Sequence, residues 1–408
     1  MSFSAMAKGT DGMRQRNLSS VLQTVALNGP LTRSELTRRT GLNRSTIGAL
    51  VGELVKFGFV EETSPATSAG VGRPSQVISV NDGVTAITVR PLADAIVIEL
   101  VGLGGVIRRQ IRAAVERTPT VGDAINMSSA IIEAFVANRA DNDRLLGIGV
   151  AIAGSVRQRD GYVLTAEGLG WAETPFGHLL GDATGLSVVV NSDSQLAAIA
   201  EHLYGAAQGT HDMLYLTGDA AGIRGGVIAQ DKPLAGHRGF AGDIGHLEVE
   251  PGGAACRCGR HGCLDAEIGL LRLLDAAGAG AAADLADVLT SSRAALEKEV
   301  RRQSELLARA LGNVARMFDP ATIVLDGYLR TLAEQRRDRM VAVFDAVSPA
   351  KLTLAKLTED NVTIGAAQTV FGELLENPGV VAQRFTEPAD DSQHWSRQRL
   401  NPEVFKRP

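Results

Sequence analysis

The sequence lacks any long hydrophobic run, and this absence argues against a membrane-spanning helix. No stretch of uncharged apolar residues approaches the roughly 20 that a helix needs to cross a bilayer. The first residues, MSFSAMAKGTDGMRQRN, contain no apolar core of signal-peptide length. We therefore expect a cytoplasmic protein without a membrane partner.

Aromatic residues and cysteines are also scarce. Aromatics make up 4% of the 408 residues, whereas glycine occurs 45 times, which favours an α/β protein with tight turns over an aromatic-rich β sandwich. A hydrophobic content of 45% and a charged content of 21% predict folded domains, two or three at this length. The three cysteines fall within eight residues, and an odd number in a cytosolic protein favours metal binding over disulfides.

The net charge of −5 is unevenly distributed along the chain. Residues 1–80 contain nine Lys and Arg against five acidic residues, so this part carries +4 and the remainder −9. A basic segment on an acidic body is expected of a DNA-binding module that is joined to a metabolic domain. The charge alone does not distinguish a DNA-binding surface from an ordinary solvent-exposed helical face.

Residues 12–80 have the pattern of a winged helix-turn-helix. Apolar residues recur at helical spacing from Leu18 to Ala26, and Thr32 with Glu35 forms a capping-box pattern at the start of a second helix. Asn43 is placed to cap a third helix that ends at Gly58. The segments 59–65 and 71–81 predict two strands around a loop rich in Gly, Pro and Ser, which would form the wing.

Two parts of this module are candidates for contact with double-stranded DNA. The third helix should enter the major groove, because its first residues face away from its apolar stripe. Ser45 and Thr46 could instead only cap that helix. Gly72-Arg73-Pro74 could project Arg73 into a minor groove or be a plain exposed turn, and the sequence favours neither. The predicted DNA-contacting residues are Arg33, Asn43, Arg44, Ser45, Thr46 and Arg73.

The remainder of the chain alternates strand and helix patterns, which predicts an α/β fold with mixed sheets. VTAITV and AIVIELVGLGGVI indicate a hairpin, and EKEVRRQSELLARALGNVARMF indicates a long helix. Residues 379–408 lose this periodicity, so we expect a mobile C-terminal tail there.

One cluster of residues predicts a metal site. His246, Cys256, Cys258 and Cys263 offer one imidazole and three thiolates, which is a donor set for structural zinc, one ion per chain. Gly259 and Gly262 would let the backbone fold around a single ion. His261 is a rival nitrogen ligand, although it lies inside the cysteine loop. Four protein ligands leave no open position, so we expect no catalysis by this zinc.

The stretch GFAGDIGHLEVEPGG together with CRCGRHGCLD resembles the signature of the ROK family of repressors, open reading frames and sugar kinases. GIGVAIAG, NSDSQLAAIAE and IVLDG occur in the family's order, and the N-terminal helices are similar to its repressor branch. The resemblance covers about residues 14–378. It implies a two-lobed actin-like (ribonuclease H-like) sugar-kinase fold in 81–378, with lobe one at about 81–195 plus 365–378 and lobe two at about 196–364. It also implies a homodimer or homotetramer.

The residues that handle ATP in family kinases have changed here. VRPLADAIVI stands where the family has an Asp-x-Gly-x-Thr phosphate hairpin, and its bulk and extra acid oppose phosphate binding. The second phosphate turn, AAGIRGG, contains Arg224 among its glycines, although the positive charge of this residue could bind a phosphorylated ligand. Asp326-Gly327-Tyr328 replaces the glycines on the adenosine side. We expect no ATP cofactor and no enzymatic activity.

The residues that bind the sugar in family kinases are better preserved in this chain than those that bind ATP. Asp193 aligns with the family's catalytic base, and we also expect it to be the N-cap of the next helix. Ser192 replaces an Asn, and Asp243 and Asp265 each replace a Glu. The resemblance also places His246 beside the sugar. The predicted ligand-binding residues are therefore Ser192, Asp193, Asp243, His246 and Asp265.

The sequence thus predicts a nucleoid-associated DNA-binding regulator, a repressor of sugar metabolism genes that senses a sugar or sugar phosphate. Two alternatives stay open. One is an ATP-dependent sugar kinase with a DNA-binding head, and the other is a regulator that has lost its ligand.

Overall fold

The computed structural model describes residues 10–63, 76–140, 142–219, 222–280, 284–290, 293–335, 344–345 and 348–385. The chain divides into two compact units. The first gathers Met1–Val150, Pro175–Val189 and Ala366–Pro408, and the second gathers Ala151–Thr174 and Val190–Gly365. Within the described ranges, no helix is both long and apolar enough to span a bilayer.

The first unit begins with three helices and a small sheet. These are α1 (Thr10–Asn28), α2 (Arg33–Thr40) and α3 (Arg44–Phe57), with strands β1 (Leu31–Thr32), β2 (Val60–Thr63) and β3 (Val77–Val80) in the order β1-β3-β2. Thr32 and Glu35 form the predicted capping box at α2. Asn43 caps α3, and Gly58 ends it in the left-handed conformation, as predicted. Residues 64–75 of the predicted wing, with Arg73, lie outside the described residues.

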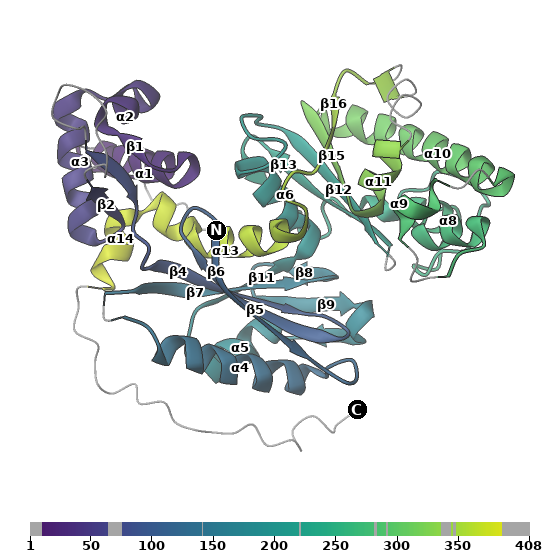
Figure 1. Ribbon diagram of the computed structural model, residues 1–408, viewed down its shortest axis with the longest axis horizontal. Helices are drawn as coiled ribbons and strands as arrows, with labels where there is room; N and C mark the ends of the chain where they lie inside the picture. Colours follow the sequence, from purple (N-terminus) through teal and green to yellow (C-terminus); the bar gives the residue numbers. More distant parts are fainter. Residues whose placement is uncertain are drawn as a thin grey trace. The chain divides into compact units, whose positions relative to one another are not determined.

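The next part of this unit is a mixed five-stranded sheet, in the order β11-β7-β4-β5-β6. Its strands are β4 (Val84–Pro91), β5 (Ala95–Gly102), β6 (Val106–Ala114), β7 (Arg144–Ile152) and β11 (Val188–Ser192). Strands β4 and β5 pair antiparallel, which confirms the predicted hairpin, whereas β4 and β7 pair parallel. Helices α4 (Val121–Ala137) and α5 (Phe176–Thr184) cover one face of this sheet, and α13 (Asn361–Glu376) lies on the other (Figure 1).

The N-terminal helices and this sheet share one hydrophobic core. Its buried residues come from α1 to α3, from β4 and β5, and from α13 and α14 (Pro378–Gln383). The Ser19 hydroxyl donates a hydrogen bond of 2.6 Å to the Leu375 carbonyl, which ties α1 to α13. The expected tail therefore does not begin at 379, because Val381 and Ala382 are buried in this core. Residues 386–408 lie outside the described ranges.

The second unit is built on another five-stranded sheet, in the order β14-β13-β12-β15-β16. The strands are β12 (Met213–Asp219), β13 (Gly222–Ala229), β14 (Lys232–Pro233), β15 (Thr322–Asp326) and β16 (Lys351–Leu354). Helix α6 (Asp193–Leu203) covers one face, and α10 (Ala294–Phe318) and α11 (Gly327–Gln335) cover the other (Figure 1). A small antiparallel sheet of β8 (Ser155–Arg157), β9 (Tyr162–Ala166) and β10 (Trp171–Thr174) belongs to the same unit.

Candidate functional site: a metal cluster and a polar cavity

Four potential metal ligands meet in one loop of the second unit. The ligand atoms of His246, Cys256, Cys258 and Cys263 all lie within 4.8 Å of one another. His246 Nδ1 is 3.5 Å from Cys256 Sγ, and the sulfurs of Cys258 and Cys263 are 3.7 Å apart. One nitrogen and three sulfurs at these separations fit a tetrahedral zinc ion. This is the predicted set, and the exposed His261 is not part of it.

Tight backbone turns bring the cysteines together. The amide of Cys256 donates to the Arg260 carbonyl at 2.7 Å, and the amide of Gly259 donates to Cys256 at 2.9 Å. Gly259 and Gly262 have φ values of 85° and 69°, a region that favours glycine. A Cβ at Gly262 would also lie 1.7 Å from the Glu250 carbonyl oxygen. Both glycines therefore have the turn-forming role that the sequence predicted.

The thiol groups differ in their ease of ionisation. The backbone N–H of Arg260 donates to Cys258 and, with the Arg260 side chain, lowers the pKa of that thiol to about 6. Burial and the neighbouring sulfurs raise the pKa of Cys263 to about 12. A bound cation would favour the thiolate form of all three cysteines, because thiolates are the ligating species.

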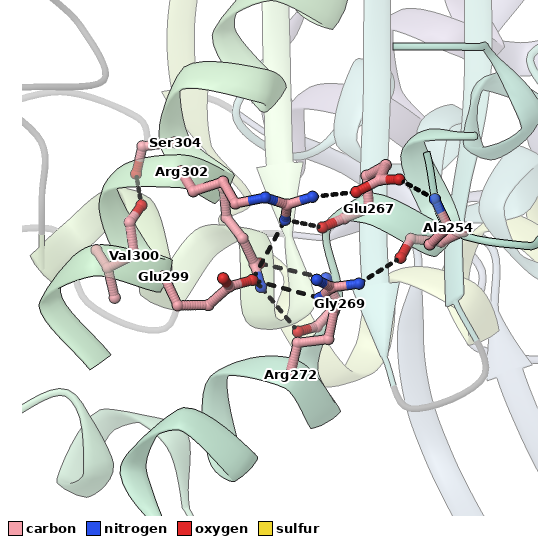
Figure 2. A network of polar contacts seen from close by, with 10 residues as sticks. Ala254, Glu267, Gly269, Arg272, Glu299, Val300, Arg302 and Ser304 are labelled. Atoms are coloured by element: carbon pink, nitrogen blue, oxygen red, sulfur yellow. Dashed lines mark hydrogen bonds and ion pairs between the residues drawn. The ribbon is translucent and has the colours of Figure 1, made fainter. Parts of the chain in front are cut away.

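A polar network ties the end of this loop to helix α10 (Figure 2). Glu267, which closes α7 (Leu264–Glu267), is buried, and its carboxylate accepts a hydrogen bond from the Ala254 amide. Arg302 forms an ion pair with the same carboxylate and donates to the Glu267 carbonyl at 2.8 Å. Gln303 exchanges two hydrogen bonds of 3.2 Å with the backbone of Gly269. These contacts anchor the end of the loop on helix α10, and they do not depend on a metal ion.

A cavity in the second unit lies beside the cluster. Its walls come from the turn after β7, the small β8–β9 sheet, the start of α6, strand β13 and the 239–257 loop. Of the predicted ligand residues, Ser192, Asp243 and His246 line it, whereas Asp193 and Asp265 do not. His246 Nδ1 faces Cys256 Sγ, and the same residue also lines the cavity.

Asp193 is held by an arginine instead. The prediction that Asp193 is the N-cap of α6 is wrong, because Ser192 occupies that position and Asp193 is the first helical residue. Arg224 donates to both Asp193 oxygens, with Nε–Oδ1 at 3.2 Å and Nη2–Oδ2 at 3.1 Å. Arg224 also contacts Asp219 at 2.7 Å. These carboxylates raise the pKa of Arg224 above its ordinary value, so the guanidinium is charged.

Asp265 does not line the cavity but is bonded to two residues that do, Ile223 and Arg257. Its Oδ1 accepts from the Ile223 amide at 2.7 Å, and its Oδ2 lies 3.1 Å from Arg257 Nη2. Arg257 also approaches Glu167 at 3.3 Å, and both of these residues line the cavity. Sequence reasoning missed Arg257 and Glu167. The position of Arg257 between two metal-ligating cysteines was the signal that could have identified it.

Asp326 and Tyr328, which the resemblance places at the adenosine side of family kinases, are both buried. Tyr328 is buried, and its ring lies against Gly218, where a Cβ would come within 2.3 Å of a ring carbon. Asp326 accepts hydrogen bonds from the Tyr215 hydroxyl at 2.6 Å and from the Asn361 amide at 2.7 Å. Both side chains are therefore packed into the interior of the unit.

The β4–β5 turn stands where the resemblance places the first phosphate hairpin of family kinases. Here the β4–β5 turn closes on itself, since the Leu92 amide donates to the Ala95 carbonyl at 2.7 Å. Asp94 forms an ion pair of 2.6 Å with Arg112. The Leu92 amide is thus already engaged in the turn and is not free for an oxyanion.

Four of the predicted DNA-contacting residues, Asn43 to Thr46, lie at the start of α3, and Arg33 begins α2. Asn43 Oδ1 accepts from the Thr46 amide at 2.9 Å and from the Ser45 hydroxyl at 2.7 Å. Arg44 is exposed and has no ion pair among the described residues. Arg33 contacts Glu62 on β2 at 2.8 Å. Capping thus occupies Asn43 and Ser45, while Arg44 projects freely.

The fold and the cluster define a class of protein, namely a sugar-kinase-like α/β chain with a Cys₃His loop. The ROK family pattern matches residues 93–372, and the chain belongs to this family.

Three comparisons describe the chain's similarity to known proteins. A xylose repressor from Caldicellulosiruptor bescii is 25% identical over 392 residues, which cover 90% of this chain and 98% of the repressor. A glucokinase from Halalkalibacterium halodurans is 30% identical over 222 residues, which cover 50% of this chain and 67% of the kinase. The crystal structure of a ROK family transcriptional regulator, a homologue of the Escherichia coli MLC protein, has a TM-score of 0.73 at 22% identity, covering 91% of this chain and 99% of that one.

Proposed function

We propose that this chain is a DNA-binding transcriptional repressor of sugar-metabolism genes whose ROK portion binds a sugar without phosphorylating it. The observation that carries the proposal is the ion pair between Asp193 and Arg224. It occupies the residue that aligns with the catalytic base of family kinases. The similarity to a xylose repressor over 98% of that protein's length supports the regulatory part.

The N-terminal elements α1 to α3 and β1 to β3 would form the winged helix-turn-helix. The short α2 and the longer α3 are joined by a turn at Gly41, which has φ 71°. Helix α3 would lie in the major groove, with Arg44 as its free cation. Arg73 on the wing stays a candidate for the minor groove.

Three features oppose sugar phosphorylation. Phosphoryl transfer depends on positioning the phosphates and neutralising their charge. The closed turn at Leu92 removes one phosphate contact, and the ring of Tyr328 fills the adenosine side. The Asp193 carboxylate has both oxygens hydrogen-bonded to Arg224, so it is poorly placed to take a proton from a sugar hydroxyl.

The cluster of His246, Cys256, Cys258 and Cys263 would hold one structural zinc ion. When bound, zinc would join the two ends of the 246–263 loop and fix the His246 ring beside the cavity. Four protein ligands leave no position for substrate. The domain limits and a homodimeric or homotetrameric state remain predictions.

A paired experiment tests this function. The purified full chain and its Arg44→Ala variant are each used to select fragments from genomic DNA of the source organism, at physiological salt. We expect discrete enriched sites for the unaltered chain and loss of that enrichment for the variant. Equal enrichment by both proteins would contradict the placement of α3 in the groove.

The alternative kinase function is tested with a coupled ADP assay. Sugars, magnesium and ATP are added to the full chain and to an Asp193→Asn variant. We expect no turnover in either protein. Turnover that the substitution abolishes would replace the proposed function by that of a kinase with a DNA-binding head.

A further inference from the structure

An ion pair in the N-terminal part of the first unit joins α2 to β2. Arg33, the first residue of α2, donates from Nη2 to Glu62 Oε2 at 2.8 Å. The Glu62 side chain is 16% exposed, whereas that of Arg33 is 46% exposed. Among the described residues, the other N–H groups of Arg33 have no protein acceptor. The pair therefore fixes one end of the guanidinium and leaves its other donors available to a ligand.

The Arg33 guanidinium lies beside the exposed face of α3. Its Nη1 is 3.7 Å from the position that a Cβ on Gly48 would take. Gly48 lies one helical turn after Arg44 and one turn before Gly52, so these three residues form one row along the helix. The opposite side of α3 is buried and consists of Ile47, Leu50, Val51 and Leu54. Because neither glycine has a side chain, Arg33 supplies the long polar group beside the second turn of this row.

The ion pair determines which part of a DNA duplex Arg33 suits. A phosphate contact depends on positive charge that releases counterions from the DNA. Glu62 offsets the charge of Arg33 and itself repels a phosphate, so the pair is a weak phosphate ligand. The edge of a guanine instead offers two uncharged acceptors, O6 and N7, which a guanidinium can contact together. This contact needs N–H donors in a fixed orientation, and a carboxylate bonded to one nitrogen supplies that orientation.

We infer that Arg33 reads a guanine in the major groove and that Glu62 is the positioning residue for Arg33. Gly48 contributes by its size, because a longer side chain there would occupy the space beside the guanidinium. The base preference of the chain then depends on α2 and β2 as well as on α3. This inference rests on the proposed DNA-binding function and deepens it by naming a base and the residue that reads it.

The inference is tested on a DNA fragment that the full chain enriches in the genomic selection. Each base pair of the fragment is replaced in turn, and fluorescence anisotropy gives the affinities of the full chain and of its Arg33→Ala variant. We expect one G·C pair whose replacement weakens binding of the full chain at least about fivefold, and that of the variant less than about twofold. An unchanged pattern in the variant, or a uniform loss of affinity with reduced salt dependence, would overturn the inference, and the latter would identify a phosphate contact. Absence of any enriched fragment would instead overturn the DNA-binding function itself.

A second substitution tests the positioning role of Glu62. Glu62→Gln keeps the size of the side chain and removes its charge, so we expect the preference for that G·C pair to fall at least about threefold. Binding to unrelated DNA should stay the same or become stronger, because one negative charge is lost. The control, Glu53→Gln, removes the charge from a matched ion pair, Arg14 with Glu53 at 2.8 Å, and should leave the preference unchanged. An unchanged preference in Glu62→Gln, or equal weakening on all DNA as expected of a purely structural role, would overturn the positioning role.

Discussion

The anchoring of the cysteine loop on α10 gives a quantitative prediction for Arg302→Met. This change removes the cation from Glu267, whose side chain is 2% exposed, and leaves a buried carboxylate with the Ala254 amide as a partner. Breaking a buried ion pair costs about 3–5 kcal/mol. Because the Arg302 side chain is itself 33% exposed, water can partly replace it. We therefore expect the free energy of unfolding of the second unit to fall by about 2–3 kcal/mol.

Urea denaturation followed by tryptophan fluorescence measures this loss. Trp171 is buried in the second unit, and replacing Trp395, the other tryptophan, by Phe leaves Trp171 as the reporter. Arg301→Met, which removes an exposed arginine from the same helix, is the control and should cost under about 0.5 kcal/mol. Adding Glu267→Gln to Arg302→Met should recover at least about 1 kcal/mol, since no buried charge is then left alone. Equal losses in the control and in Arg302→Met would refute this reasoning.

Other substitutions test further contacts. Gly218→Ala should destabilise the second unit by about 1–3 kcal/mol in the same urea assay, because the added methyl would meet the ring of Tyr328, whereas Gly280→Ala, with nothing within 4 Å, should be nearly neutral; a neutral Gly218→Ala would refute the packing. Asn43→Ala removes the cap of α3 and should cost about 1 kcal/mol in thermal unfolding of the first unit; an unchanged Tm would count against this cap. Cys258→Ser should lower the bound zinc measured by metal analysis to well under one ion per chain and lower stability with it; a full complement of zinc in the variant would contradict the ligand set.

Local sequence signals predicted much of this structure. Capping by Thr32 and Asn43 depends on residues three positions away, and the metal cluster depends mainly on a short run of cysteines. In both cases the interacting groups are neighbours in the sequence, so composition and spacing suffice to identify them. The β4–β5 hairpin is predictable for the same reason.

Partners from distant segments were not predictable. Asp193 has the sequence pattern of a helix cap because an apolar helical segment begins directly after it, yet its partner Arg224 lies 31 residues away on β13. The pairing of Arg257 with Asp265 and the anchoring of Glu267 by Arg302 likewise depend on tertiary packing. The change in net charge near residue 80 suggested a domain limit there. In the folded chain, however, residues of α1 and α13 pack into one hydrophobic core, although these helices are far apart in the sequence.

This ROK chain is proposed to sense a sugar without phosphorylating it. That proposal is tested most directly by the fluorescence anisotropy of a labelled DNA fragment from the genomic selection, bound to the full chain. Free sugars are titrated with and without ATP and magnesium, and ADP is monitored in parallel. We predict that one unphosphorylated sugar weakens DNA binding at least tenfold, equally with and without ATP, while no ADP forms. DNA release that requires ATP and is accompanied by ADP formation would contradict this prediction.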